Sequence, residues 1–147
     1  MTAKIAVVMT AAEHLRALSA AMADRYVDDC VAHAAAIAAL LLAEGRSPWI
    51  GRVRDTRVMG ELTFHGPLIP RRFVGRNAPA WTTHYIACSG AEVYDPLVGE
   101  PTAIDGYTEL VFGRALDVET HLDVDVTAEL LRDGTLRQHC RSVRGPR

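Results

Sequence analysis

The feature that most constrains the fold is an apolar run from Cys30 to Glu44, with acidic residues before it and Gly45 after it. Asp28 or Asp29 can accept hydrogen bonds from the first backbone N–H groups of a helix, and glycine is the commonest residue just past a helix end. The run is apolar nearly all round, which is typical of a helix that is buried on every side. We therefore expect a central, buried helix over this run.

The rest of the chain divides into a second helix and a series of strands. Thr10 and Glu13 form a capping-box pattern, so a helix is expected from Ala11 to about Asp24. Strand-forming runs follow Pro48, and a short helix is expected near the C-terminus. The strand runs are 49–54, 61–65, 84–88, 91–95 and 108–112, and the short helix is 125–132. Two helices followed by several strands predict an α+β fold.

The domain organisation follows from length and composition. A chain of 147 residues, 49% of them hydrophobic, is long enough to bury one core, so a single domain over 1–147 is expected. Its core should cover about 11–132, and 133–147 should form a basic tail. Because no aromatic residues alternate with the arginines, binding of nucleic acid is not expected. No apolar run is long enough to span a membrane.

The cysteines point to a reducing environment. Cys30, Cys88 and Cys140 are odd in number and widely spaced, which is unlike a disulfide framework. We therefore expect a cytoplasmic protein. Export by a route that needs no signal peptide remains an alternative. The sequence does not disclose the oligomeric state.

A predicted hairpin at 83–96 places two titratable side chains together. If Ser89 and Gly90 form a two-residue turn, counting outward sets His84 directly opposite Asp95. Directly opposed side chains share one face with Cβ atoms about 4.5–5.5 Å apart, which allows a carboxylate to accept from an imidazole N–H. A three-residue loop would slip the register by one and move the aspartate off that face.

Cys30 is the candidate partner of this pair because it falls in the first turn of the central helix. Unpaired N–H groups and the helix dipole favour a thiolate there, and a thiolate beside a histidine can attack a carbonyl. The alternative is a small apolar residue at a buried helix start. Cys30 and His33 are one helical turn apart, and either could ligate zinc together with His84. No CxxC or HExxH pattern supports such a site, so we expect no metal and no cofactor.

Taken together, these residues resemble the transglutaminase-like branch of the papain-like cysteine proteases. That family has a cysteine at the start of a central helix, a Gly-x-Pro turn into a strand, a strand-borne histidine and then an Asp-Pro. This chain has Cys30, Gly45-Arg-Ser-Pro48, His84 and Asp95-Pro96 in the same order. The resemblance implies a papain-like fold in which the central helix packs against an antiparallel, partly barrel-like sheet. It also implies a Cys–His–Asp catalytic triad.

The leading functional hypothesis is a cysteine hydrolase or acyltransferase that acts on an amide or thioester: a protease, amidase, deamidase or transglutaminase-type transferase. Its partner would be a peptide, a protein side chain or a small amide or thioester. A proline-rich loop over 66–79 precedes the histidine strand, and Arg71, Arg72 and Trp81 are the candidate substrate contacts. One alternative is a non-catalytic binding module on the same fold with a vestigial triad. Another is an unrelated small α+β protein.

Overall fold

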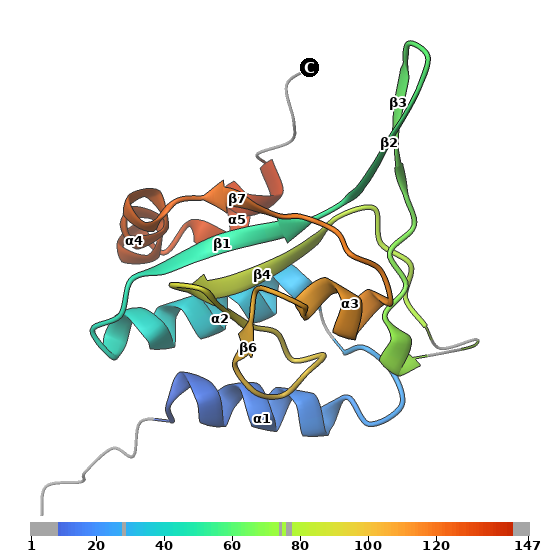
Figure 1. Ribbon diagram of the computed structural model, residues 1–147. Helices are drawn as coiled ribbons and strands as arrows, with labels where there is room; N and C mark the ends of the chain where they lie inside the picture. Colours follow the sequence, from blue (N-terminus) through green and yellow to red (C-terminus); the bar gives the residue numbers. More distant parts are fainter. Residues whose placement is uncertain (1–8, 28, 74, 76–77, 143–147) are drawn as a thin grey trace, which may run out of the picture.

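The computed structural model describes residues 9–27, 29–73, 75 and 78–142 (Figure 1). The chain is an α+β protein, as predicted. Its elements are α1 (Ala11–Ala21), α2 (Cys30–Ala43), β1 (Pro48–Val53), β2 (Asp55–Met59), β3 (Leu62–Gly66), the 3-10 helix η1 (Arg71–Phe73), β4 (His84–Ser89), β5 (Glu92–Tyr94), β6 (Thr102–Ala103), α3 (Tyr107–Phe112), β7 (Val118–Leu122), α4 (Val124–Asp133) and α5 (Leu136–Ser142).

Five of the strands found in the described residues form one antiparallel sheet in the order β6-β5-β4-β1-β7. The sheet is open, with β6 at one edge and β7 at the other, so the expectation of a partly barrel-like sheet is not met. The two remaining strands, β2 and β3, pair only with each other and form an arm that projects from the body (Figure 1). The sheet therefore has two faces, and each must be covered by other elements.

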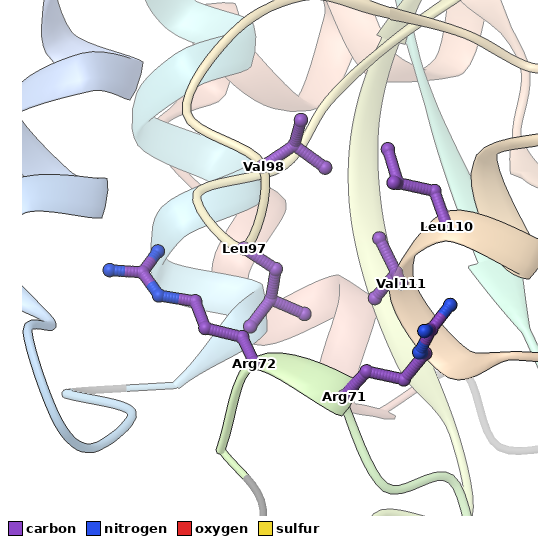
Figure 2. Close-up of a pocket in the computed structure, with 6 residues that line it drawn as sticks. All are labelled: Arg71, Arg72, Leu97, Val98, Leu110 and Val111. Carbon is purple, nitrogen blue, oxygen red and sulfur yellow. The ribbon is translucent and has the colours of Figure 1, made fainter.

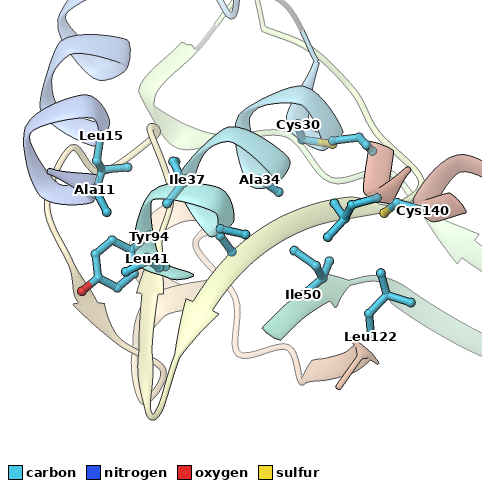
Figure 3. Close-up of a cluster of buried hydrophobic side chains, with 14 residues drawn as sticks. Ala11, Leu15, Cys30, Ala34, Ile37, Leu41, Ile50, Tyr94, Leu122 and Cys140 are labelled. Atoms are coloured by element: carbon cyan, nitrogen blue, oxygen red, sulfur yellow. The ribbon is translucent and has the colours of Figure 1, made fainter. Parts of the chain in front are cut away.

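The central helix α2 covers one face of the sheet and lies between it and α1 (Figure 1). Side chains along one stripe of α2, among them Ile37 and Leu41, are fully buried against Ile50 of β1 and Ala87 of β4. We call this buried set the α2-side cluster, and Figure 3 shows how α1 and α5 also contribute to it. The expectation that this helix is buried on every side is wrong: Ala36, Ala39 and Ala43 are exposed, and the helix forms one side of the core.

The opposite face of the sheet is covered by α3, η1 and the loop after β5. Here Ile86 and Cys88 of β4 pack with Val93 of β5 and with Tyr107 and Phe112 of α3. We call this set the α3-side cluster. Because successive side chains of a strand point to opposite faces, β4 contributes alternate residues to the two clusters.

The run 108–112 was expected to be a strand, and that prediction is wrong: it lies in α3. Its buried residues, Tyr107, Thr108, Val111 and Phe112, recur at helical spacing. Burial of this stripe against the sheet outweighs the β-propensity of valine and phenylalanine, which is strongly context-dependent.

The C-terminal segment expected to be a basic tail contains α5. Leu136 and Cys140 of α5 are buried in the α2-side cluster, so this helix is part of the core. None of the helices in the part of the chain that the structure describes is long and apolar enough to cross a membrane.

Replacement of Ile37 by alanine should lower the free energy of unfolding by about 2–5 kcal/mol, because it removes a fully buried side chain and leaves a cavity. Leu42→Ala is the matched control on the same helix; Leu42 is half-buried and outside both clusters, so its replacement should cost about 1 kcal/mol or less. Urea denaturation followed by circular dichroism measures both. Equal losses would show that α2 is not packed as described.

Candidate active site

Asp29 fixes the start of α2 and therefore the position of Cys30. Its backbone is extended, and its Oδ1 accepts a hydrogen bond of 2.7 Å from the N–H of Ala32, as expected for an N-cap. Its Oδ2 lies 3.5 Å from the guanidinium of Arg137 on α5, which offsets part of the negative charge beside the cysteine. Cys30 is the first residue of the helix, and its N–H has no hydrogen-bond partner among the described residues.

The hairpin brings His84 and Asp95 together, but in a different register from the one predicted. The turn is centred one position later, with Gly90 at a positive φ of 57°, and Ser89 pairs with Glu92. The pairing is thus displaced by two residues, which leaves every side chain on its original face. Asp95 lies diagonally from His84, and its Oδ2 is 2.8 Å from His84 Nε2.

Asp95 is held by donors from three parts of the chain. His84 Nε2 and the hydroxyl of Tyr107 both donate to Oδ2, and the N–H of Leu97 donates to Oδ1 at 2.9 Å. Burial would raise the pKa of Asp95, but the charge of His84 and these hydrogen bonds together hold it below its ordinary value of 3.8. The carboxylate is therefore ionised, although its side chain is only 1% exposed.

Aromatic rings enclose His84. Trp81 stacks on the imidazole with ring centroids 4.5 Å apart and an interplanar angle of 18°. Phe112 and Tyr26 meet it edge-on, with centroids 5.8 Å and 6.4 Å away. This burial alone would lower the pKa of His84, but the charge and hydrogen bond of Asp95, helped by Cys30, raise it to about 10. At neutral pH the ring is an imidazolium.

Cys30 meets the histidine at the start of β4, where the two buried clusters approach each other. The N–H of Tyr85, the residue after His84, donates to Cys30 Sγ at 3.5 Å. The thiol lies close enough to the imidazole to contribute to its raised pKa. His84 Nδ1 is buried and has no hydrogen bond of standard geometry among the described residues, so it is the ring nitrogen left to exchange a proton with the thiol.

The structure therefore brings Cys30, His84 and Asp95 into one site. Trp81 belongs to it through its stack on His84. The site is enclosed: Cys30 is 8% exposed, and the side chains of His84 and Asp95 are 1% exposed each.

Arg71 and Arg72 lie on η1 and line a different cavity of about 440 Å³, shown in Figure 2. Cys30, His84 and Asp95 do not line this pocket. Arg72 donates to Ser19 Oγ at 2.7 Å and to the carbonyl of Pro96 at 3.1 Å, which fixes its position. That either arginine contacts a substrate stays a prediction.

A metal site is not apparent in the part of the chain that the structure describes, because no group of three or more His, Cys, Asp or Glu side chains there could hold an ion. His33, which was considered as a zinc ligand, has its Nδ1 3.0 Å from the hydroxyl of Tyr26.

Comparison with known proteins gives no match: no family model, no curated protein and no solved structure resembles the chain closely enough to be matched to it.

Tyr107 is the site residue that sequence reasoning missed. It is fully buried at the start of α3, and its hydroxyl donates to Asp95, twelve positions earlier. Burial and the neighbouring carboxylate raise its pKa well above 10.0, so it stays a donor. No local signal marks this role, since the contact depends on how α3 packs on the sheet.

Replacement of Tyr107 by phenylalanine should raise the pKa of Asp95 and lower the free energy of unfolding by about 1–3 kcal/mol, because a hydrogen bond to a buried carboxylate is lost. Tyr94→Phe is the matched control: it also removes a tyrosine hydroxyl bound to a charged group, Arg46 at 2.7 Å, but its side chain lies in the α2-side cluster, on the opposite face of the sheet from Tyr107. Carbon-13 NMR titration of the aspartate carboxyl measures the pKa. An unchanged Asp95 titration in Tyr107→Phe would contradict the assignment.

The buried pair also predicts how stability depends on pH. The pKa of His84 is raised from 6.5 to about 10, so its contribution is complete below pH 6.5 and is lost as pH rises toward 10. The pKa of Asp95 is lowered from 3.8, so its contribution is complete above that value and is lost in acid. The free energy of unfolding, measured with urea at successive pH values, should therefore fall between pH 6.5 and 10.

Asp95→Asn should remove this alkaline fall, because a buried histidine without its carboxylate stays neutral. His84→Gln serves the same purpose if the asparagine variant does not fold. A fall of equal size in the wild type and in either variant would show that the pair does not cause it.

Proposed function

We propose that this chain is a cysteine-dependent acyl-transfer enzyme of the transglutaminase-like type, with Cys30 as nucleophile, His84 as general base and acid, and Asp95 as the group that orients the histidine. The observation that supports it best is the position of His84: Nε2 is bound to Asp95 at 2.8 Å, while Nδ1 is left without a hydrogen bond on a ring that lies beside the Cys30 thiol. The same arrangement of roles defines catalytic triads on unrelated folds.

In the proposed reaction, the proton of the Cys30 thiol already resides on His84 Nδ1, so the resting pair is a thiolate and an imidazolium, and the thiolate Sγ attacks the carbonyl carbon of an amide or thioester. An imidazolium next to sulfur favours the thiolate form, and Asp95 stabilises the imidazolium. The N–H of Cys30, at the positive end of α2, can donate to the oxyanion of the tetrahedral intermediate. His84 then gives its proton to the departing amine or thiol, and an acyl-enzyme remains.

Water or an amine completes the turnover. The acceptor loses its proton to His84 as it attacks the thioester carbonyl, and the thiol is regenerated. Because Cys30 is only 8% exposed, a slender group such as a side-chain amide or a small molecule reaches the sulfur more readily than a backbone amide within a folded chain. This favours amidase, deamidase or transferase chemistry over general proteolysis.

Cys30→Ala and His84→Ala should each lower turnover by about 10³-fold or more while the protein stays folded. A suitable assay is ammonia release from small glutamine-containing peptides, with and without an added primary amine, alongside hydrolysis of small thioesters. Cys140→Ala is the matched control, since it removes a buried cysteine of α5 outside the triad. Turnover that survives in Cys30→Ala would refute the mechanism.

Alkylation tests the nucleophile without a substrate. Iodoacetamide at pH 6–7 should modify Cys30 at least about tenfold faster than Cys88 or Cys140, both of which are fully buried; burial also raises the pKa of the Cys88 thiol. Peptide mass spectrometry gives the three rates. Equal or slower modification of Cys30 would favour the non-catalytic binding module.

A further inference from the structure

The pocket beside η1 lies next to the segments that hold Asp95. Its lining comes from three places: Arg71 and Arg72 of η1, Leu97 and Val98 after β5, and Leu110 and Val111 of α3 (Figure 2). Its volume of about 440 Å³ is within the range of small-molecule sites, roughly 300–1,000 Å³.

Two walls of this pocket carry donors to the triad carboxylate. In one wall, the N–H of Leu97 donates to Asp95 Oδ1. The other wall is formed by Leu110 and Val111 of α3, and Tyr107, at the start of the same helix, donates to Oδ2. Between them, Arg72 binds the carbonyl of Pro96, the residue directly after the aspartate. A ligand that shifts either wall therefore changes the hydrogen bonds that orient His84.

The lining indicates what the pocket takes. Its centre is apolar, and Figure 2 shows the four aliphatic side chains between two arginines that point to opposite sides. None of the described residues that line it is acidic. Arg71 has no hydrogen bond or ion pair among the described residues, and Arg72 is bound by oxygen atoms of Ser19 and Pro96 and by no carboxylate. Positive charge beside an apolar cavity suits a small organic anion with an apolar body.

We propose that this pocket is an effector site for a small carboxylate that carries an apolar chain, and that its occupancy alters how Asp95 is held. The carboxylate pairs with Arg71, and the chain lies against Leu97, Val98, Leu110 and Val111. The effect on catalysis rests on the proposed function, whereas binding does not. Coupling between ligand binding and the hydrogen bonds of Asp95 requires that the ligand bind two arrangements of the pocket walls with different affinity. The loop at 97–98 and α3 are the elements that would move.

Binding is tested with decanoate as the probe, by calorimetry on the full chain. Decanoate should bind saturably, and decan-1-ol, which has the same chain without the charge, at least about tenfold more weakly. Arg71→Gln should weaken decanoate binding by about tenfold or more. Arg16→Gln, which removes an exposed arginine on α1 that is not among the residues lining the pocket, should leave it unchanged. No saturable binding, equal binding of the alcohol, or equal effects of the two arginine variants would overturn the proposal.

Coupling is tested by NMR in Cys30→Ala protein, where catalysis is absent by design. Saturation with decanoate should shift the amide signal of Leu97 and the ring signals of His84, and both shifts should disappear in Arg71→Gln. Binding without any shift at these two residues would overturn the effector role. Because this variant needs no turnover, loss of the proposed enzymatic function and loss of the effector site are separate outcomes.

Discussion

The buried ion pair between His84 and Asp95 is the interaction on which the rest of the site depends. Two charges with side chains only 1% exposed are costly to remove from water, and such a pair persists only when further hydrogen bonds satisfy it. Here the carboxylate accepts from β4, from the loop after β5 and from the start of α3. Three segments that are separate in sequence must therefore be in place together.

The sheet explains how a cysteine and a histidine from different clusters come to face each other. Cys30 belongs to the α2-side cluster, while His84 points to the face covered by α3. Cys30 and His84 meet because α2 and β4 begin at the same place. The thiol of Cys30 therefore lies at the end of β4, next to the N–H of Tyr85, and not over one face of the sheet. The position of the helix start, set by Asp29 and by its pairing with Arg137, is thus as important as the hairpin.

Local signals in the sequence were sufficient for α1, α2 and α4, because caps and apolar runs act over a few residues. The capping box of Thr10 begins α1, the N-cap Asp29 begins α2, and Gly134 ends α4. The meeting of His84 with Asp95 was predicted through the wrong register, and it survived because the error was two residues, which preserves the face.

The remaining features depend on contacts between distant segments. The β-rich composition of 108–112 predicts a strand, and only the packing of this segment on the sheet selects the helix α3. Tyr107 could not be recognised without that helix. In the same way, the burial of Leu136 and Cys140 cannot be read from an arginine-rich segment, because two apolar residues four positions apart gain significance only against a completed core.

The stack of Trp81 on His84 has an optical consequence. An imidazolium held 4.5 Å from an indole accepts an electron from its excited state, whereas a neutral imidazole does so poorly. The other tryptophan, Trp49, donates to the carbonyl of Gly90 at the far end of β4, away from any histidine described in the site. The native fluorescence of this chain therefore contains one emitter that reports the protonation of His84 and one that serves as its internal reference.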